Sequence, residues 1–186
     1  MTRPGGESGG GRGDFPQNTP SRDHRRHPGH VREDVTPYCR LRIDREGRWY
    51  YEDSEIVHPA IYQYFNRCLR KDDEGRYVIC TEDQLCAVEV EDAPFVVVQV
   101  MHEQASQGDE GDFIIHLNDG TREHLVLDSL WVGLHNVLYC KVKEGAFHAR
   151  FLRPAYYQLA EFVEYEEESG RFYVERNKVK QYISGV

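Results

Sequence analysis

The five residues PAIYQ, which begin at Pro59, return as PAYYQ at Pro154, 95 residues further along the chain. At the same spacing, the Gly-Arg pair that begins at Gly75 returns at Gly170. An internal repeat constrains a fold more than a single motif does, because each copy buries its apolar face against its neighbour. Two unrelated helices that share a proline start are the alternative. We favour duplication, because a turn, a helix start and a second turn recur in the same order.

Each copy opens with a candidate β-hairpin. Residues 38–53 alternate apolar and polar side chains on both sides of Glu46-Gly47, as the two strands of a hairpin do. Gly47 supplies the positive φ that a short hairpin loop needs. The second copy has Glu144-Gly145 in the same place, between the candidate strands 136–142 and 146–151. Both copies therefore start with two antiparallel strands.

A helix follows each hairpin and begins at its proline, because the missing N–H of proline costs nothing in a first helical turn. Apolar residues at helical spacing give the first helix an inward face: Ile61, Tyr64, Phe65, Cys68 and Leu69. The second helix is predicted to run from Pro154 towards Glu166, with this inward face: Tyr156, Leu159, Ala160 and Val163. The pattern predicts an α+β fold in which a duplicated strand-turn-strand-helix-strand unit forms two packed halves.

The chain divides into a tail and two repeats. Residues 1–36 carry Gly, Pro, Ser and Arg but almost no aliphatic side chains, so they cannot offset their ordering entropy by burial, and we expect disorder. The first α+β repeat is assigned to residues 37–104 and the second to residues 105–186. Units of this size are marginally stable alone, so we expect the halves to pack together with a binding groove between them.

The formal net charge is −9, the wrong sign for a surface that tracks phosphates, so the composition argues against long DNA or RNA as a ligand. No segment has the apolar core of a signal peptide or the length of a membrane span. We therefore expect a soluble, cytoplasmic protein without a membrane partner. The sequence sets no oligomeric state.

The five cysteines are Cys39, Cys68, Cys80, Cys86 and Cys140. Their number is odd and no Cys-x-x-Cys pair occurs, which argues against a disulfide framework and a structural zinc site. All five are predicted to be reduced thiols that act as small hydrophobic side chains. The chain also lacks a glycine-rich phosphate loop, a Gly-x-Ser-x-Gly elbow and a paired metal-ligand motif, so we expect no catalytic residues, no metal and no cofactor.

The segment GRWYYEDSEI, the helix after it and above all Val90–Phe95 (VEDAPF) resemble a bacterial family known as domain of unknown function 1285. The stretch RPAYYQL, which begins at Arg153, resembles the start of the second helix of the family. The resemblance covers roughly residues 39–164. It implies a duplicated α+β unit whose C-terminal half is loosely similar to pleckstrin-homology folds. It also implies a groove between the halves that binds a nucleotide-like ligand, and a role in signalling.

The chain departs from the family pattern after Thr81. Two positions that carry cationic residues in the family are Leu85 and Ala87 here. A phosphate pocket normally keeps such groups, so their absence argues against a highly charged phosphate as the ligand.

Five residues are candidates for contact with a ligand. Glu91 and Asp92 lie between two apolar strands, where a carboxylate at a strand end accepts hydrogen bonds from a ribose or base; a turn or capping acid is the alternative. Arg153 lies at a helix N-terminus, where an anion finds unpaired N–H groups; a surface ion pair is the alternative. Tyr50 supplies a stacking face, and Thr81, kept from the family pattern, supplies a hydroxyl.

Two functions remain open at this point. One is a non-catalytic module that binds a small polar, nucleotide-like ligand between the two halves. The other is a protein-interaction domain that docks a basic partner. Its acidic face would consist of side chains at the end of the second helix: Glu161, Glu164, Glu166, Glu167 and Glu168.

Overall fold

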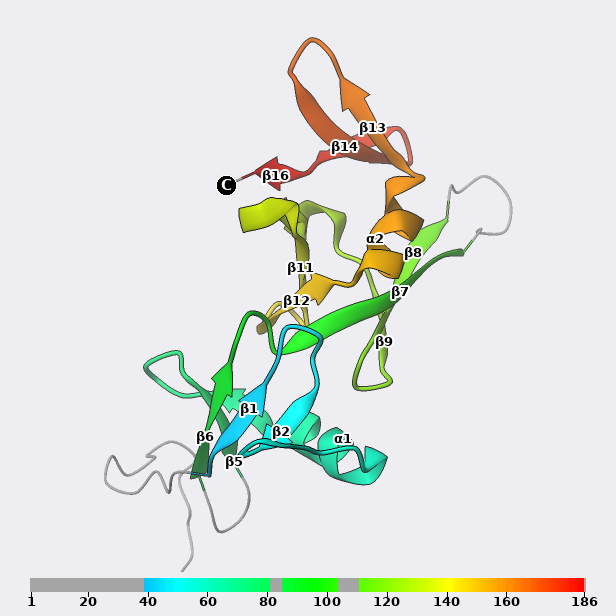
Figure 1. Cartoon of the computed structure of the whole chain (residues 1–186). Helices are drawn as coiled ribbons and strands as arrows, with labels where there is room; N and C mark the ends of the chain where they lie inside the picture. The colour runs from blue at the N-terminus through cyan, green and yellow to red at the C-terminus, as the bar shows by residue number, and fades with distance from the viewer. Residues whose placement is uncertain (1–38, 81–84, 104–110, 186) are drawn as a thin grey trace, which may run out of the picture. The chain divides into compact units, whose positions relative to one another are not determined.

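The described part of the chain is an α+β protein with two sheet-rich halves (Figure 1). The structure, a computed structural model, describes residues 39–80, 85–103 and 111–185. About half of these residues lie in β-strands, and the α-helices are α1 (Pro59–Cys68) and α2 (Arg153–Ala160). Both helices carry their proline in the first turn, as predicted. The proposed tail, residues 1–36, lies outside the described residues. No helix in the described ranges has the length and apolar character needed to cross a bilayer.

The N-terminal half contains a six-stranded sheet in the order β3-β2-β1-β6-β5-β4. Its strands are β1 (Leu41–Ile43), β2 (Trp49–Tyr51), β3 (Ser54–Glu55), β4 (Leu69–Lys71), β5 (Tyr77–Cys80) and β6 (Leu85–Val90). β1 and β2 form the hairpin predicted around Gly47, and β1 pairs in parallel with β6. Leu41 and Ile43 are buried, while Arg42 between them lies on the other face of the sheet.

The buried side of α1 matches the predicted one in part, because Phe65 and Cys68 pack against the core but Ile61 and Tyr64 do not. Asn66 is buried, and its Oδ1 accepts a hydrogen bond from Trp49 Nε1 at 3.0 Å. Phe65 packs against the core beside Trp49. Ile61 and Tyr64, both predicted to face inward, are 44% and 45% exposed. The inward side of the helix is the one that carries Asn66, because that side chain is held by the buried indole.

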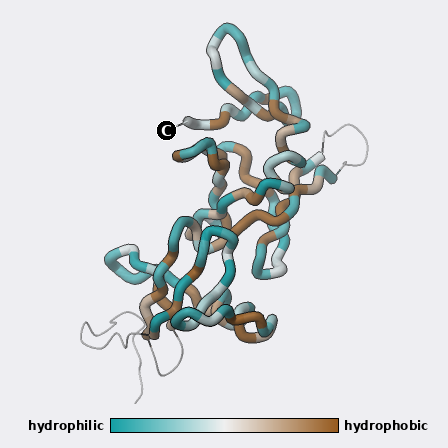
Figure 2. The backbone as a smooth tube through the Cα atoms, viewed as in Figure 1, coloured by the Kyte–Doolittle hydropathy of each residue, from teal (hydrophilic) through white to brown (hydrophobic). Residues whose placement is uncertain are grey.

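The C-terminal half contains a seven-stranded sheet in the order β16-β10-β11-β12-β7-β8-β9. Its strands are β7 (Phe95–Glu103), β8 (Asp112–Leu117), β9 (Arg122–His124), β10 (Trp131–Val132), β11 (Leu138–Val142), β12 (Phe147–Phe151) and β16 (Ser184–Gly185). Short 3-10 turns, Leu127–Ser129 and Leu134–Asn136, flank β10. β7 begins with the buried run Phe95–Val97, and Figure 2 shows this hydrophobic strand in brown. The sheets change over between Val90 and Phe95, ahead of the predicted division at residue 104.

A separate three-stranded antiparallel sheet follows α2 and contains β13 (Val163–Glu166), β14 (Arg171–Arg176) and β15 (Val179–Tyr182). The prediction that the second helix reaches Glu166 is wrong, because α2 ends at Ala160 and Val163 pairs with Val174 across the ladder. The spacing of Leu159, Ala160 and Val163 fits a helix, but pairing with β14 decides the local structure.

The prediction of five reduced thiols is also wrong, because Cys39 and Cys86 form a disulfide with their Cα atoms 5.4 Å apart. The parallel register between β1 and β6 places Leu41 opposite Val88. The two cysteines each precede one of these partners by two residues, so they lie side by side at the end of the ladder. Cys140 is a buried thiol, and burial raises its pKa to about 12.

Candidate functional site

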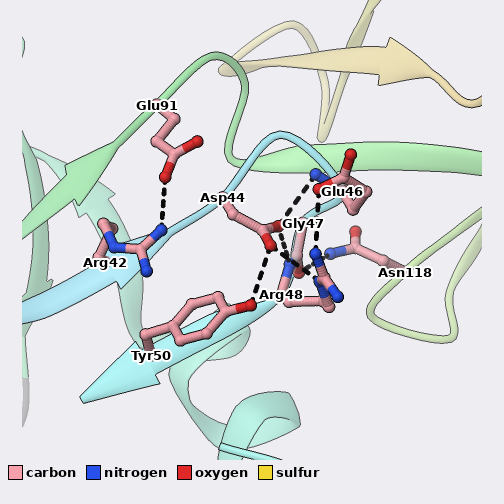
Figure 3. A network of polar contacts seen from close by, with 8 residues as sticks. All are labelled: Arg42, Asp44, Glu46, Gly47, Arg48, Tyr50, Glu91 and Asn118. Atoms are coloured by element: carbon pink, nitrogen blue, oxygen red, sulfur yellow. Dashed lines mark hydrogen bonds and ion pairs between the residues drawn. The ribbon is translucent and has the colours of Figure 1, made fainter. Parts of the chain in front are cut away.

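The turn between β1 and β2 is organised around one nearly buried carboxylate, that of Asp44 (Figure 3). The backbone N–H groups of Glu46 and Arg48 both donate to Asp44 Oδ1 at 2.9 Å. Arg48 Nε donates to Oδ2 at 2.8 Å, and the Tyr50 hydroxyl donates to the same oxygen at 3.2 Å. Burial alone would raise the pKa of Asp44, but the hydrogen bonds from Arg48 and Glu46 outweigh it and hold the pKa below its usual range.

The same turn occurs a second time at Asp72. Glu74 and Arg76 donate their backbone N–H groups to Asp72 Oδ1 at 3.0 and 2.8 Å, and Arg76 Nε donates to Oδ2 at 2.7 Å. The five-residue pattern Asp-x-Glu-Gly-Arg, present at residues 44–48 and 72–76, encodes both turns. This repeated pattern is the sequence signal for the Asp44 cluster, although Asp44 was not among the predicted site residues.

Asn118 connects this turn to the second sheet. Its side-chain amide donates to the carbonyl oxygen of Gly47 at 2.9 Å, and its Oδ1 accepts from the backbone N–H of Val96 at 3.1 Å. A depression of about 270 Å³ lies at this contact and is lined in part by Arg48 and Tyr62. The two Asn118 bonds therefore join the β1–β2 turn of the first sheet to β7 of the second sheet.

Glu91 and Tyr50 share one partner, Arg42. The Arg42 guanidinium forms an ion pair with Glu91 and lies 4.2 Å from the centre of the Tyr50 ring (Figure 3). The backbone N–H of Glu91 also donates to the carbonyl oxygen of Ile43 at 3.0 Å. Arg42 therefore occupies both the carboxylate and the ring face that the sequence analysis assigned to a ligand.

Asp92 forms a separate cluster with Arg150 and Tyr139. Arg150 makes an ion pair with Asp92, and the Tyr139 hydroxyl donates to the two carboxylate oxygens at 2.9 and 3.1 Å. Burial raises the pKa of Tyr139, and the hydrogen bond to Asp92 acts in the same direction. Tyr139 and Arg150 are direct partners in the ladder between β11 and β12, so their side chains share one face. Asp92 thus fixes the position of Arg150.

Arg150 also lines a groove of about 440 Å³ together with Arg153. We call this the arginine groove and define it by five of its lining residues: His135, Arg150, Arg153, Tyr156 and Tyr157. The two tyrosines are 41% and 65% exposed. Arg153 makes no ion pair with any residue in the described ranges, and α2 has no side-chain N-cap. The arginine groove therefore combines an uncompensated cation with exposed aromatic rings.

A larger groove of about 910 Å³ continues from the arginine groove, and the two share Asn136, Leu138 and Tyr156. We call it the apolar groove and define it by these lining residues: Val132, Leu138, Leu159, Ala160, Val163 and Ile183. Leu138 and Leu159 are buried. This second groove supplies apolar surface directly beside the two arginines.

The predicted site residues thus fall into two groups. Tyr50 and Glu91 both contact Arg42, whereas Asp92 pairs with Arg150, which lines the same groove as Arg153. Thr81 lies outside the described residues. Sequence reasoning missed Arg42 and Arg150, although each occupies the polar position of an alternating strand, between two buried residues.

The apolar positions Leu85 and Ala87 lie in β6, and Ala87 lines another depression with Arg40 and Arg42. Both arginines there are already ion-paired, Arg40 with Glu52 at 2.7 Å and Arg42 with Glu91. This depression therefore offers less free positive charge than the arginine groove. In the described part of the chain, no three His, Cys, Asp or Glu side chains are grouped closely enough to hold a metal ion.

Comparisons with known proteins give one family. The family described as Domain of unknown function (DUF1285), N-terminal domain, matches residues 32–93. A crystal structure of a DUF1285 family protein from Silicibacter pomeroyi DSS-3 has a TM-score of 0.64 and 23% identity, and the match covers 81% of this chain and 82% of that chain. A second DUF1285 family structure, from Shewanella baltica OS155, has a TM-score of 0.52 and 21% identity over 65% of this chain and 90% of that chain. No curated protein matches the chain.

Proposed function

Since the chain belongs to the DUF1285 family, we propose that it is a non-catalytic module that binds a small polar anion in the arginine groove. By the family resemblance, the ligand is nucleotide-like and the module acts in signalling. The observation that carries the proposal is Arg153, a cation without an ion-pair partner in the described ranges of a chain whose formal net charge is −9. In so acidic a protein, an uncompensated arginine inside a groove is the position at which an anion gains most.

The neighbours of Arg153 support the same ligand. Arg150 is held in place by Asp92 and still lines the groove, so it offers a second donor at no cost in side-chain ordering. Tyr156 and Tyr157 expose ring surface on which a base can stack. Asp92 and Tyr139 act here as positioning residues, because they hold Arg150 rather than face the groove.

Binding is tested by isothermal titration and thermal shift with AMP, ATP, adenosine and inorganic phosphate. We expect the phosphorylated compounds to raise the melting temperature, because a ligand that binds only the native state stabilises it. Arg153→Ala should weaken their binding roughly 10- to 100-fold, the loss of one hydrogen bond to a charged group. Arg122→Ala is the matched control, because Arg122 is exposed on β9 and makes no ion pair with a described residue. Equal binding to wild type and Arg153→Ala would reject the proposal.

The acidic face is a weaker second candidate. Glu164 already accepts a hydrogen bond from the Tyr173 hydroxyl, and Glu166 accepts bonds from Lys180 and Tyr182. These two carboxylates are thus engaged within the three-stranded sheet rather than available to a basic partner. Capture of a basic protein by the wild type, lost in Glu161→Gln and Glu167→Gln together, would favour this second function.

We also propose that the two halves arose by duplication. A hairpin, a helix with proline in its first turn and three antiparallel strands follow in the same order in both halves. The corresponding turn glycines Gly47 and Gly145 have φ of 75° and 84°. The halves differ in their parallel strand pairs. In the first half β6 pairs with β1, whereas in the second half β16 pairs with β10. Superposition of residues 47–79 on 145–174 in a crystal structure tests this origin. A likeness of the C-terminal half to pleckstrin-homology folds is part of the same proposal.

A further inference from the structure

The arginine groove does not end at its polar residues. Asn136, Leu138 and Tyr156 line it and also line the apolar groove, so the two form one continuous depression along α2. We infer that the ligand of this site is an anionic amphiphile, with its head group at Arg153 and Arg150 and an unbranched apolar chain along α2. This inference rests on the proposed function and names the class of ligand more closely.

The apolar groove has the size and lining of a ligand site. Its volume of about 910 Å³ lies within the usual range for small-molecule pockets, roughly 300–1,000 Å³. Val132, Val163 and Ile183 line it, and each is only partly buried while packing against the core. These side chains therefore keep apolar surface in contact with water, and a hydrocarbon chain would cover it.

The charges along the depression fix the direction of the ligand. Arg171 also lines the apolar groove, but its guanidinium lies 4.1 Å from the centre of the Tyr182 ring and is engaged there. Arg153 is exposed and makes no ion pair with any residue that the structure describes. The anionic head of the ligand therefore binds at Arg153, and its hydrocarbon chain extends from Tyr156 towards Val163.

A methylene chain suits the apolar groove better than a peptide does. A peptide would bring an N–H and a C=O at every residue, and each would need a partner once water is displaced. Three of the side chains that line the groove, Leu138, Leu159 and Val163, present only carbon. A hydrocarbon chain makes no such demand. Long acyl phosphates and long fatty acids share this chemistry of an anionic head and an apolar chain.

The test is a series of butyl, hexyl and octyl phosphate, titrated calorimetrically into the full-length chain beside inorganic phosphate and AMP. We expect the dissociation constant to fall about fourfold for each methylene added, the gain on transfer of CH₂ out of water. Arg153→Ala should weaken every member of the series roughly 10- to 100-fold, and Arg122→Ala should not. Octanoate and octyl phosphate compared at equal chain length distinguish a carboxylate head from a phosphate head.

A second variant tests whether the hydrocarbon chain of the ligand lies in the apolar groove. Ala160 lines the apolar groove at the end of α2, so Ala160→Phe should fill it and abolish the gain with chain length. Ala60→Phe is the matched control, because Ala60 is an exposed residue of α1 that lines none of the grooves described above. The control should keep the full dependence on chain length, and circular dichroism verifies that both variants fold.

The outcomes separate the inference from the proposed function. If phosphate and AMP bind through Arg153 but affinity does not rise with chain length, the amphiphile is rejected and the proposed function stands. If uncharged octyl glucoside binds as tightly as octyl phosphate, the head-group assignment fails and the amphiphile is rejected. The proposed function is rejected only if phosphate and AMP also bind wild type and Arg153→Ala equally. If affinity for Ala160→Phe still rises with the length of the hydrocarbon chain, the inference is also overturned, because the hydrocarbon chain then lies outside the apolar groove.

Discussion

Gly47 and Asn118 lie 71 residues apart in the sequence, and the Asn118 side-chain amide donates a hydrogen bond to the Gly47 carbonyl oxygen at 2.9 Å. The contact requires glycine at position 47 for two reasons. The backbone there has a φ of +75°, and a Cβ would come within 2.6 Å of Asn118 Nδ2. Close approach and left-handed conformation thus coincide at one residue.

We predict that Gly47→Ala destabilises the protein more than Gly75→Ala. Both positions have a positive φ, 75° and 79°, so both variants incur about 1–2 kcal/mol of backbone strain. Gly75 has no atom within 4 Å of the added Cβ, whereas Gly47 also forces Asn118 to move, at roughly 1–3 kcal/mol more. Urea unfolding of the two variants measures the difference. Equal losses in the free energy of unfolding would mean that Asn118 moves away from the added Cβ at no energetic cost.

Asp44→Ala is predicted to lower the free energy of unfolding by about 1–3 kcal/mol, because backbone donors in a nearly buried turn lose their acceptor. Asp72→Ala removes the bonds from Glu74 and Arg76 in the matching turn, whereas Asp44→Ala also removes the bond from Tyr50. The Asp72 turn is also more exposed, since Gly75 is exposed and Gly47 is buried, so Asp72→Ala should cost less. Chemical denaturation of both variants provides the comparison. A larger loss in Asp72→Ala would show that burial does not set the importance of these turns.

Glu166 is predicted to make stability depend on pH in the acid range. Hydrogen bonds from Lys180, Ser169 and Tyr182 lower its pKa from 4.5 to about 2. A depressed folded-state pKa gives a stabilisation that is complete above pH 4.5 and is lost as the pH falls towards about 2. Glu166→Gln should therefore melt below wild type at pH 7, and the gap should narrow on going to pH 3. Glu167→Gln removes the same charge at an exposed neighbour and should change the melting temperature less at pH 7.

The disulfide between Cys39 and Cys86 is predicted to stabilise the first sheet. It closes a loop with a sequence separation of 47, for which the chain-entropy estimate is about 4 kcal/mol. Alkylation of the unfolded chain without reductant should label Cys68 and Cys140 but leave one pair blocked. Reductant should then lower the melting temperature of wild type but not that of Cys39→Ser/Cys86→Ser. Labelling of every cysteine without reductant would show that the protein does not contain this disulfide.

Local patterns predicted the elements whose structure is set by neighbouring residues. Glu46-Gly47 and Glu144-Gly145 mark hairpins, and Pro59 and Pro154 mark helix starts, because turn and first-helix-turn conformations depend on a few adjacent residues. The end of α2 was different. Val163 continues the helical spacing, but it gains its partner Val174 from a strand that the chain forms later. The hydrophobic periodicity of a segment carries no information about a strand partner that lies later in the chain.

The candidate site was predictable in part. Alternation and strand ends drew attention to Glu91, Asp92 and Arg153, and all three lie beside an arginine or a groove. What the sequence did not reveal is that Arg42 and Arg150 pair with the two acids, because each contact joins an arginine on a strand to an acid in a bend far away in the sequence. The same holds for Cys39 and Cys86, which only the parallel register between β1 and β6 brings together.

The parallel pairing of β7 with β12 has a consequence for synthesis on the ribosome. Phe95 is the register partner of Ala149, yet the ribosome makes all of β8 to β11 between them. Until β12 emerges, the apolar run Phe95–Val97 lacks its neighbour on that side, and an uncovered apolar strand edge is where nascent chains aggregate. The first sheet, by contrast, has all its strands once Val90 is made. A translation arrest after β6 therefore leaves a complete sheet, whereas an arrest between β7 and β12 leaves a chain that needs a chaperone.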